Sequence, residues 1–399
     1  MILPDAPWQH QEGLDALTAA LGAAAGAVRP VGGAVRDTLL GLPVADLDLA
    51  TIHAPDETLR RIRAAGLKAV PTGIAHGTIT AVLPGGAVEV TTLRRDVATD
   101  GRHAIVRFTD DWREDAARRD FTINALSADP RTSALFDYFD GLADLERGIV
   151  RFIGDPLTRI AEDHLRILRF FRFHARFGRG APDTEGLAAC VARANDMMAL
   201  SRERVAQELL KLLAADDPVP TVRIMSAHGI FAPIVPEVSP DGVERLARLV
   251  AREGNAGDPV RRLAALLPAR VDVAEAVARR LKLSNSQRRR LMLAAGEARP
   301  SNPRALAYDI GVEAARDRLL LRADDAELTD GMTAIAGWQP PRLPIAGGAL
   351  ISLGLRAGPS VAATLREVEA RWIAEGFPDH QRVLEIARAA VDQRLRARK

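Results

Sequence analysis

The feature that most constrains the fold is a strand–turn–helix–strand unit near the N-terminus that carries two glycines and two aspartates. A short apolar run over residues 27–31 predicts a strand, and Gly32, Gly33 and a helical pattern follow it. The chain then returns through a second predicted strand that contains Asp46 and Asp48. Because side chains alternate between the two faces of a strand, we expect both aspartates on the same face.

This combination indicates a nucleotide and metal site. Two neighbouring carboxylates repel each other unless a cation lies between them, and Mg²⁺ prefers oxygen ligands. Glycines let the backbone approach a phosphate closely, and the N-terminus of the next helix offers N–H groups to it. Each half has an ordinary alternative, a turn for the glycines and a solvated strand end for the aspartates. Together they favour transfer of a nucleotidyl group from a nucleoside triphosphate.

The same residues resemble the signature of a known family. Gly32-Gly33-x-Val35-Arg36-Asp37, followed by Asp46-x-Asp48, is similar to the motif of the class II nucleotidyltransferases. These enzymes include bacterial tRNA CCA-adding enzymes and bacterial poly(A) polymerases. The resemblance implies an α+β N-terminal nucleotidyltransferase head, with a small mixed sheet and helices, followed by all-α neck, body and tail domains. It also implies that Asp46 and Asp48 are catalytic and hold two Mg²⁺ ions.

A second motif, over residues 118–126, contains two adjacent arginines and two polar residues in an otherwise apolar segment. Adjacent arginines can bind triphosphate oxygens, while Asp120 and Asn124 offer an acceptor and an amide suited to ribose hydroxyls. The alternative is an ordinary helix start with an aspartate near its positive end. By resemblance, Arg119 contacts the triphosphate together with Arg36 and the two glycines, and Asp120 contacts the ribose.

A third motif lies in residues 157–177, where acids and arginines recur at spacings of three and four and predict one helix. Intrahelical ion pairs, each worth about 0.3–0.5 kcal/mol, are the ordinary interpretation. Alternatively, a carboxylate and a guanidinium together match the Watson–Crick edge of a base. By resemblance, Asp163 and Arg166 read cytosine or adenine, and Arg169 and Arg172 lie towards the triphosphate. Residues 201–209 resemble a further motif that supports this helix.

Two segments leave alternatives open. Glu89 lies on a predicted strand between apolar neighbours, and it either joins the two aspartates as a third catalytic acid or faces solvent. Residues 94–118 are rich in charge and are expected to form a mobile loop. In the resembled family, a flexible loop at this place takes part in switching between nucleotides, and it has an element similar to Asp100-Gly101-Arg102-His103.

Length and composition set the outer bounds. A chain of 399 residues with 47% hydrophobic residues predicts about two to four domains with cores of their own. The resemblance implies a catalytic head over residues 1–150, a helical neck with the base-recognition helix over 151–215, a helical body over 216–305 and a tRNA-binding helical tail over 306–399. Only four of the 54 basic residues are lysines. The excess of arginine fits an RNA partner, although codon usage in a GC-rich genome explains most of it.

Other classes of protein are excluded by simple counts. One cysteine, Cys190, excludes a disulfide framework and a cysteine-rich zinc site. No apolar run reaches the roughly 18 residues that a membrane span needs. The N-terminus lacks a basic region followed by an apolar core, so we expect a cytoplasmic protein. The oligomeric state stays open.

The resemblance implies a template-independent enzyme that adds C, C and A to tRNA 3′ ends from CTP and ATP, with release of pyrophosphate. It would contact the acceptor end and the elbow of tRNA. The alternatives are a bacterial poly(A) polymerase, a CC-only or A-only enzyme, and a catalytically inactive RNA-binding protein. Bacterial poly(A) polymerases usually carry a strongly basic extension, and this sequence has none.

Overall fold

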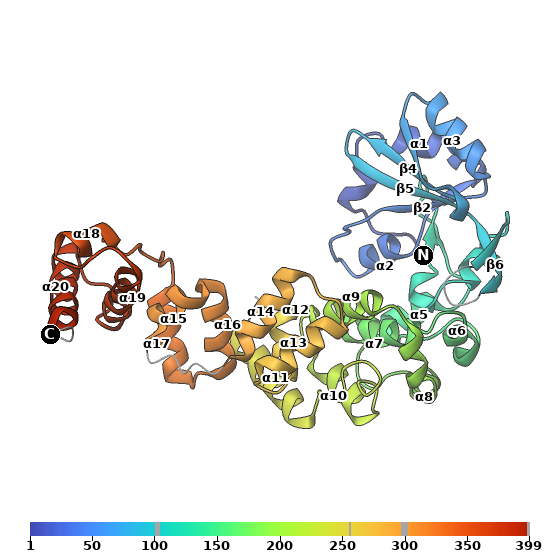
Figure 1. Ribbon diagram of the computed structural model, residues 1–399. Helices are drawn as coiled ribbons and strands as arrows, with labels where there is room; N and C mark the ends of the chain where they lie inside the picture. Colours follow the sequence, from blue (N-terminus) through green and yellow to red (C-terminus); the bar gives the residue numbers. More distant parts are fainter. Residues whose placement is uncertain (100–103, 255–256, 297–301, 397–399) are drawn as a thin grey trace. The chain divides into compact units, whose positions relative to one another are not determined.

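The computed structural model describes residues 1–99, 104–254, 257–296 and 302–396, and for residues 96–99 and 104–106 it describes the backbone alone. The chain divides into two compact units, Met1–Pro236 and Glu237–Lys399, and each is considered by itself. The first unit starts as a mixed α/β region and continues as helices (Figure 1). The described part of the second unit is helical.

In its described residues, the mixed region contains a five-stranded sheet, two short strand pairs and five α-helices. Its elements are α1 (Leu14–Ala20), β1 (Val28–Pro30), α2 (Gly33–Leu39), β2 (Asp48–Thr51), α3 (Pro55–Ala64), β3 (Lys68–Gly73), β4 (Thr78–Leu83), β5 (Gly86–Thr92), β6 (Arg94–Thr99), β7 (Ala104–Phe108), α4 (Trp112–Ala117), β8 (Ser127–Ala128), β9 (Leu135–Phe136) and α5 (Gly141–Arg147). The predicted small mixed sheet with helices is therefore confirmed.

The five-stranded sheet has the order β1-β2-β5-β4-β3, in which β2 and β5 are parallel and the other neighbours antiparallel. Apolar side chains of α1 and α3 pack on one face, where Leu49 and Val90 are buried. Asp48 and Glu89 are register partners on β2 and β5. Because side chains alternate along a strand, both acids point to the face opposite Leu49 and Val90.

The predicted mobile loop over residues 94–118 is wrong for its described part. Strands β6 and β7 pair in antiparallel fashion, and α4 follows them. Asp111 caps α4, because its carboxylate accepts a hydrogen bond from the Arg113 N–H at 2.7 Å. Charged composition did not exclude a hairpin, since strands pair through their backbones. The Asp100–His103 element lies outside the described residues.

Helices form the rest of the first unit: α6 (Pro156–Glu162), α7 (Arg166–Phe177), α8 (Thr184–Ala192), α9 (Arg202–Leu213) and α10 (Val219–Ala227). The single helix predicted over residues 157–177 is wrong, because Asp163 has an extended backbone (φ −152°, ψ 104°) that separates α6 from α7. The Asp163 carboxylate accepts a hydrogen bond from the Leu165 N–H at 3.1 Å. Aspartate competes in this way with helical hydrogen bonding and starts a new helix instead.

An aromatic cluster packs α7 against the segment that contains the second motif. The ring of Phe121 lies 4.9 Å from that of Phe152 and 5.2 Å from that of Phe173, measured between centroids. Phe152 also stacks on Phe170 at 5.6 Å. Such pairs stabilise a core beyond the area that they bury. The cluster therefore holds the arginines of α7 close to those at residues 118–119.

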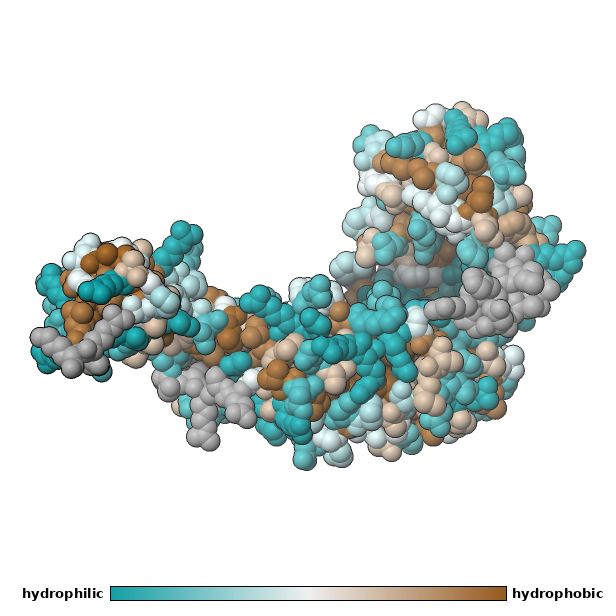
Figure 2. All heavy atoms as spheres, viewed as in Figure 1, coloured by the Kyte–Doolittle hydropathy of each residue, from teal (hydrophilic) through white to brown (hydrophobic). Residues whose placement is uncertain are grey.

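The second unit contains α11 (Pro240–Glu253), α12 (Pro259–Leu266), α13 (Val271–Arg280), α14 (Asn285–Ala295), α15 (Pro303–Ile310), α16 (Val312–Arg322), α17 (Asp325–Ile335), α18 (Gly347–Ser352), α19 (Pro359–Ala374) and α20 (His380–Arg396). One apolar cluster lies among α15–α17 and another among α18–α20. Hydrophilic residues intermingle with small apolar patches on the face shown in Figure 2. No helix in the described ranges is long and apolar enough to cross a membrane.

Candidate active site

One cavity of about 670 Å³ in the first unit brings most of the predicted residues together. It is lined by twelve of them: Gly32, Gly33, Arg36, Asp46, Asp48, Arg119, Asp120, Asn124, Asp163, Arg166, Arg169 and Arg172. The remaining one, Glu89, lines a smaller cavity of about 200 Å³ that shares Asp48 and Arg119 with the first. Motifs up to 140 residues apart in the sequence therefore meet at two adjoining cavities.

The glycine turn fits closely against an arginine. Gly32 has φ +68° and ψ −122°, a conformation that favours glycine, and its N–H donates to the Leu126 carbonyl oxygen at 2.9 Å. A Cβ atom on Gly32 would lie 2.8 Å from Nη1 of Arg119. This position therefore needs glycine both for its backbone angles and for the space that the guanidinium occupies.

The two predicted metal-binding aspartates open onto the same cavity. Asp48 is the first residue of β2, whereas Asp46 precedes the strand, so the prediction that Asp46 lies within it is wrong. The predicted alternation still holds, because Leu47 and Leu49 are buried and both aspartates are exposed. Asp46 therefore lines the same cavity as Asp48, although it lies outside the strand.

Negative charge accumulates at Asp48. Loss of solvent around the Asp48 carboxyl raises its pKa, because it disfavours the charged form. The negative charges of Glu89 and Asp46 also raise this pKa, whereas the positive charge of Arg119 lowers it. Within the described residues, Asp46, Asp48 and Glu89 form no ion pair, and no group of three His, Cys, Asp or Glu side chains is close enough to bind one metal ion. The predicted role of Glu89 stays a prediction, with its position beside Asp48 now defined.

Four of the predicted nucleotide-binding residues form one hydrogen-bonded chain. Arg36 donates to the side-chain oxygen of Asn124, whose amide donates to Asp120 Oδ1 at 2.9 Å. Arg169 Nε donates to Asp120 Oδ2 at 2.7 Å. Burial favours a raised pKa for Asp120, but the Arg169 charge and the Asn124 hydrogen bond outweigh it and lower the pKa. Asp120 therefore stays ionised and fixes two arginines beside the cavity.

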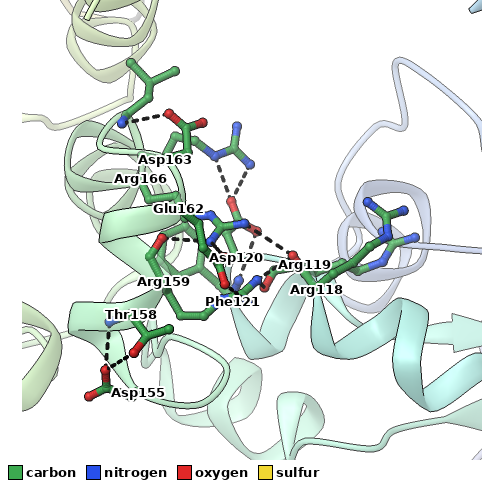
Figure 3. Close-up of polar contacts among 12 residues, drawn as sticks. Arg118, Arg119, Asp120, Phe121, Asp155, Thr158, Arg159, Glu162, Asp163 and Arg166 are labelled. Atoms are coloured by element: carbon green, nitrogen blue, oxygen red, sulfur yellow. Dashed lines mark hydrogen bonds and ion pairs between the residues drawn. The ribbon is translucent and has the colours of Figure 1, made fainter. Parts of the chain in front are cut away.

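The two predicted base-reading residues, Asp163 and Arg166, both line the cavity. They do not pair with each other, and each pairs with a different residue. Asp163 Oδ2 lies 2.7 Å from Nη2 of Arg204, which projects from α9. Arg166 pairs with Glu162 and donates to the Arg159 carbonyl oxygen at 2.8 Å (Figure 3). The contact from Arg204 agrees with the supporting role predicted for residues 201–209.

Sequence reasoning missed part of the cavity wall. Arg176 and Arg204 also line the cavity, as do Asp37 and Phe173. Arg176 Nη2 lies 3.5 Å from Asp37 Oδ2. A signal for Arg176 was present, because it follows Arg172 by four residues and therefore continues the arginine face of α7. Arg204 lies within residues 201–209, for which the resemblance predicts a supporting role, but no local spacing indicates that its side chain reaches the cavity from another helix.

The arrangement suits a polyphosphate bound between acids and arginines. Arg36, Arg119, Arg169 and Arg172 surround a volume large enough for a nucleotide, and arginine binds phosphate oxygens in pairs. The exposed carboxylates of Asp46 and Asp48 supply hard oxygen ligands at the same cavity. An acidic edge next to a cationic wall can therefore bind a nucleoside triphosphate with divalent cations.

Comparisons with known proteins agree with this chemistry. Residues 28–151 match the model of the poly A polymerase head domain, and residues 181–241 match a probable RNA and SrmB-binding site of polymerase A. The mitochondrial CCA tRNA nucleotidyltransferase 1 of Mus musculus is 34% identical, over 92% of this chain and 87% of its own. The CCA-adding enzyme of Levilactobacillus brevis is 31% identical, over 90% and 92%. The crystal structure of the Bacillus stearothermophilus CCA-adding enzyme in complex with CTP has a TM-score of 0.76 at 28% identity, and 99% of each chain is covered.

Proposed function

This chain belongs to the family of CCA tRNA nucleotidyltransferases, and from that premise we propose that it adds C, C and A to the 3′ end of tRNA. CTP and ATP are its substrates. In each step the terminal 3′-hydroxyl oxygen attacks the α-phosphorus, a new phosphodiester bond forms, the bond to the β-phosphate breaks, and pyrophosphate leaves. The hydroxyl proton passes to solvent water as the oxygen attacks.

The observation that carries the proposal is the single cavity that collects three motifs distant in the sequence. Arg36, Arg119 and the arginines of α7 face the same volume as Asp46 and Asp48. Their positive charge compensates the triphosphate and the charge that grows on the leaving pyrophosphate. Hydrogen bonds to Asn124 and Asp120 already fix Arg36 and Arg169, so these two side chains need little reorganisation on binding.

We propose that two Mg²⁺ ions bind at Asp46 and Asp48. The residues fit these ions, because two exposed carboxylates share a cavity and the pKa of Asp48 is raised by its surroundings and by neighbouring acids. When bound, Mg²⁺ lowers the pKa of a coordinated hydroxyl and neutralises phosphate charge. Glu89, beside Asp48 on the sheet, adds negative charge that favours cation binding.

For base selection we propose that Asp163 and Arg166 contact the Watson–Crick edge of the incoming base. Asp163 is held by Arg204, and Arg166 by Glu162, so each side chain has a defined position in the absence of a nucleotide. Accepting both CTP and ATP requires these side chains to change partners between additions. Discrimination against UTP and GTP then follows because those bases leave polar groups of Asp163 and Arg166 without a hydrogen-bonding partner.

We also propose that the helical tail binds the tRNA elbow. Arginines on the second unit's helices supply phosphate contacts that do not depend on base sequence. Filter binding of intact tRNA against an isolated acceptor minihelix tests the elbow contact.

For the location, we propose that the protein works in the cytoplasm. Cell fractionation tests the location, and exclusive recovery from an organelle would contradict it.

The experiment that tests the main proposal uses tRNA without its 3′ CCA and tRNA that ends in CC, each incubated with CTP, with ATP and with both, followed by sequencing of the products. Ordered addition that stops after A is the expected result. Since the head matches a poly A polymerase model, extended A tracts from ATP alone would assign that activity instead. Addition that stops at CC, or that requires an existing CC end, identifies a partial enzyme. Binding without any incorporation identifies an inactive RNA-binding protein.

A further inference from the structure

The side chains of Arg118 and Arg119 are held by one buried carboxylate that none of the motifs above includes. Asp115, on α4, is 3% exposed. Its Oδ1 accepts a hydrogen bond from Arg118 Nε at 2.9 Å, and its Oδ2 lies 3.3 Å from Arg119 Nη2. Although burial opposes ionisation, the two arginine charges lower the pKa of Asp115 below its usual range.

Asp115 also binds the segment that leaves the central sheet. Its Oδ1 accepts a hydrogen bond from the Arg94 N–H at 3.2 Å. Arg94 comes two residues after the end of β5, and the intervening Leu93 N–H donates to the Thr51 carbonyl oxygen of β2 at 2.8 Å. The carboxylate therefore connects both arginines to the ends of the strands that carry Asp48 and Glu89.

The backbone of the arginine pair is fixed separately. Arg159 donates to the carbonyl oxygens of Arg118 and Arg119, at 2.5 and 3.1 Å, and Arg166 donates to that of Arg118 at 3.3 Å. Figure 3 shows the two arginine side chains extending away from Arg159. Loss of the Asp115 charge should therefore release the guanidinium groups while the backbone keeps its place.

We infer that Asp115 is a positioning residue that sets the Arg119 guanidinium for the triphosphate. Arg119 lies between three fixed points: the Asp115 carboxylate, the Asn124 carbonyl oxygen at 3.3 Å and the backbone of Gly32. It also lines both cavities that meet at Asp48. The inference rests on the proposed function, because that function gives Arg119 a triphosphate to bind.

Neutralising the Asp115 carboxylate changes both the charge near the cavity and the orientation of Arg119, and these two changes predict opposite effects on triphosphate binding. Asp115→Asn removes a negative charge near the cavity, so simple attraction would bind a triphosphate more tightly. Loss of a charged hydrogen-bonding partner should instead let Arg119 leave its position. We expect the second effect, with the KM for both CTP and ATP raised about tenfold, a kcat changed less than about threefold, and the CTP to ATP preference unchanged.

The test measures steady-state kinetics with both nucleotides, and calorimetric binding of inorganic tripolyphosphate to the full chain. Tripolyphosphate has no base, so its affinity should fall by the same factor as the KM rises. The matched control is Asp111→Ala, which removes the cap of the same helix without touching either guanidinium, and it should leave tripolyphosphate affinity within about twofold.

A double-mutant cycle separates positioning from general damage. In an Arg119→Ala background, Asp115→Asn should have little further effect on KM or on tripolyphosphate affinity. The inference would be overturned if Asp115→Asn had as large an effect in the Arg119→Ala background as in the unmodified protein. It would also be overturned if the KM fell in the Asp115→Asn single variant. If Asp115→Asn does not fold, the test uses Asp115→Glu instead, which keeps the charge but displaces the carboxylate by one methylene. Absence of nucleotide addition by the unmodified protein would refute the proposed function, while the tripolyphosphate arm would still test Asp115.

Discussion

At the scale of single residues, Asp46 and Asp48 differ from the other acids at the main cavity in forming no ion pair with an arginine within the described residues. We predict that Asp46→Asn or Asp48→Asn lowers nucleotide incorporation by at least about a hundredfold, because metal-ion charge stabilisation is worth several kcal/mol. Primer extension measures the loss, and tRNA affinity should change less than about twofold. Asp56→Asn, an exposed acid on α3, is the control. Appreciable activity in either active-site variant would refute the metal assignment.

His174 on α7 gives a second residue-scale prediction. It is buried, and burial lowers its pKa below the ordinary value of about 6.5. Below that pH the unfolded chain binds a proton here that the folded chain does not. The local stability of α7 should therefore fall as pH decreases from about 6.5 towards the lowered pKa, and be independent of this group above that range. Hydrogen exchange of α7 at several pH values, corrected for the intrinsic exchange rate, measures it, and His174→Gln should flatten the slope. His53, whose pKa is also lowered by burial, accounts for a residual slope.

The sequence alone predicted the residues of the cavity better than their partners. Gly32, Asp48 and Arg119 are specified by local motifs whose chemistry is readable from residue type and spacing. The partner of Asp163 is Arg204, 41 residues further along the chain. Only the packing of α9 on α7 brings them together, and no local spacing contains that information.

At the scale of elements, the expected single helix failed for a physical reason that periodicity cannot detect. The i,i+4 pattern of acids and arginines continues through Asp163. The Asp163 carboxylate nevertheless accepts a hydrogen bond from the Leu165 N–H, which ends the first helix and starts a second one. The hairpin β6–β7 is not predictable from charge, because charged side chains do not prevent two strands from pairing through their backbones. The sheet, by contrast, was predictable from alternating apolar residues, as the burial of Val88 and Val90 around Glu89 shows.

The packing of α7 on α9 leads to a prediction at this scale. Arg172 Nε lies 2.6 Å from Glu208 Oε2, and the two side chains are 17% and 7% exposed. Glu208→Ala should reduce the local stability of both helices by about 2–4 kcal/mol, because it leaves a largely buried guanidinium without its counter-charge. Hydrogen exchange measures the loss in each helix. Glu57→Ala, which breaks exposed pairs with Arg60 and Arg61, should change little, and an equal effect would contradict the argument.

At the scale of the whole molecule, the second unit contains a buried ionic cluster of its own. Asp317 of α16 is fully buried and lies 2.7 Å from Arg261 Nε and 2.6 Å from Arg290 Nε. Arg261 also pairs with Glu253 at 2.9 Å. The cluster joins α11, α12, α14 and α16, which lie on both sides of the boundary predicted near residue 305. Buried pairs of this kind depend on every partner, because a remaining buried charge is costly.

Because the chain forms two compact units, a single free energy of unfolding does not describe it, and stability is best measured segment by segment. Asp317→Asn should lower protection from hydrogen exchange in α11, α12, α14 and α16 by roughly 3 kcal/mol. Strands β4 and β5 of the other unit have a separate apolar core and should be unaffected. Asp272→Asn, which removes an exposed pair with Arg270, is the control within the same unit. Equal loss of protection in β4 and β5 would show that the two units share one unfolding equilibrium.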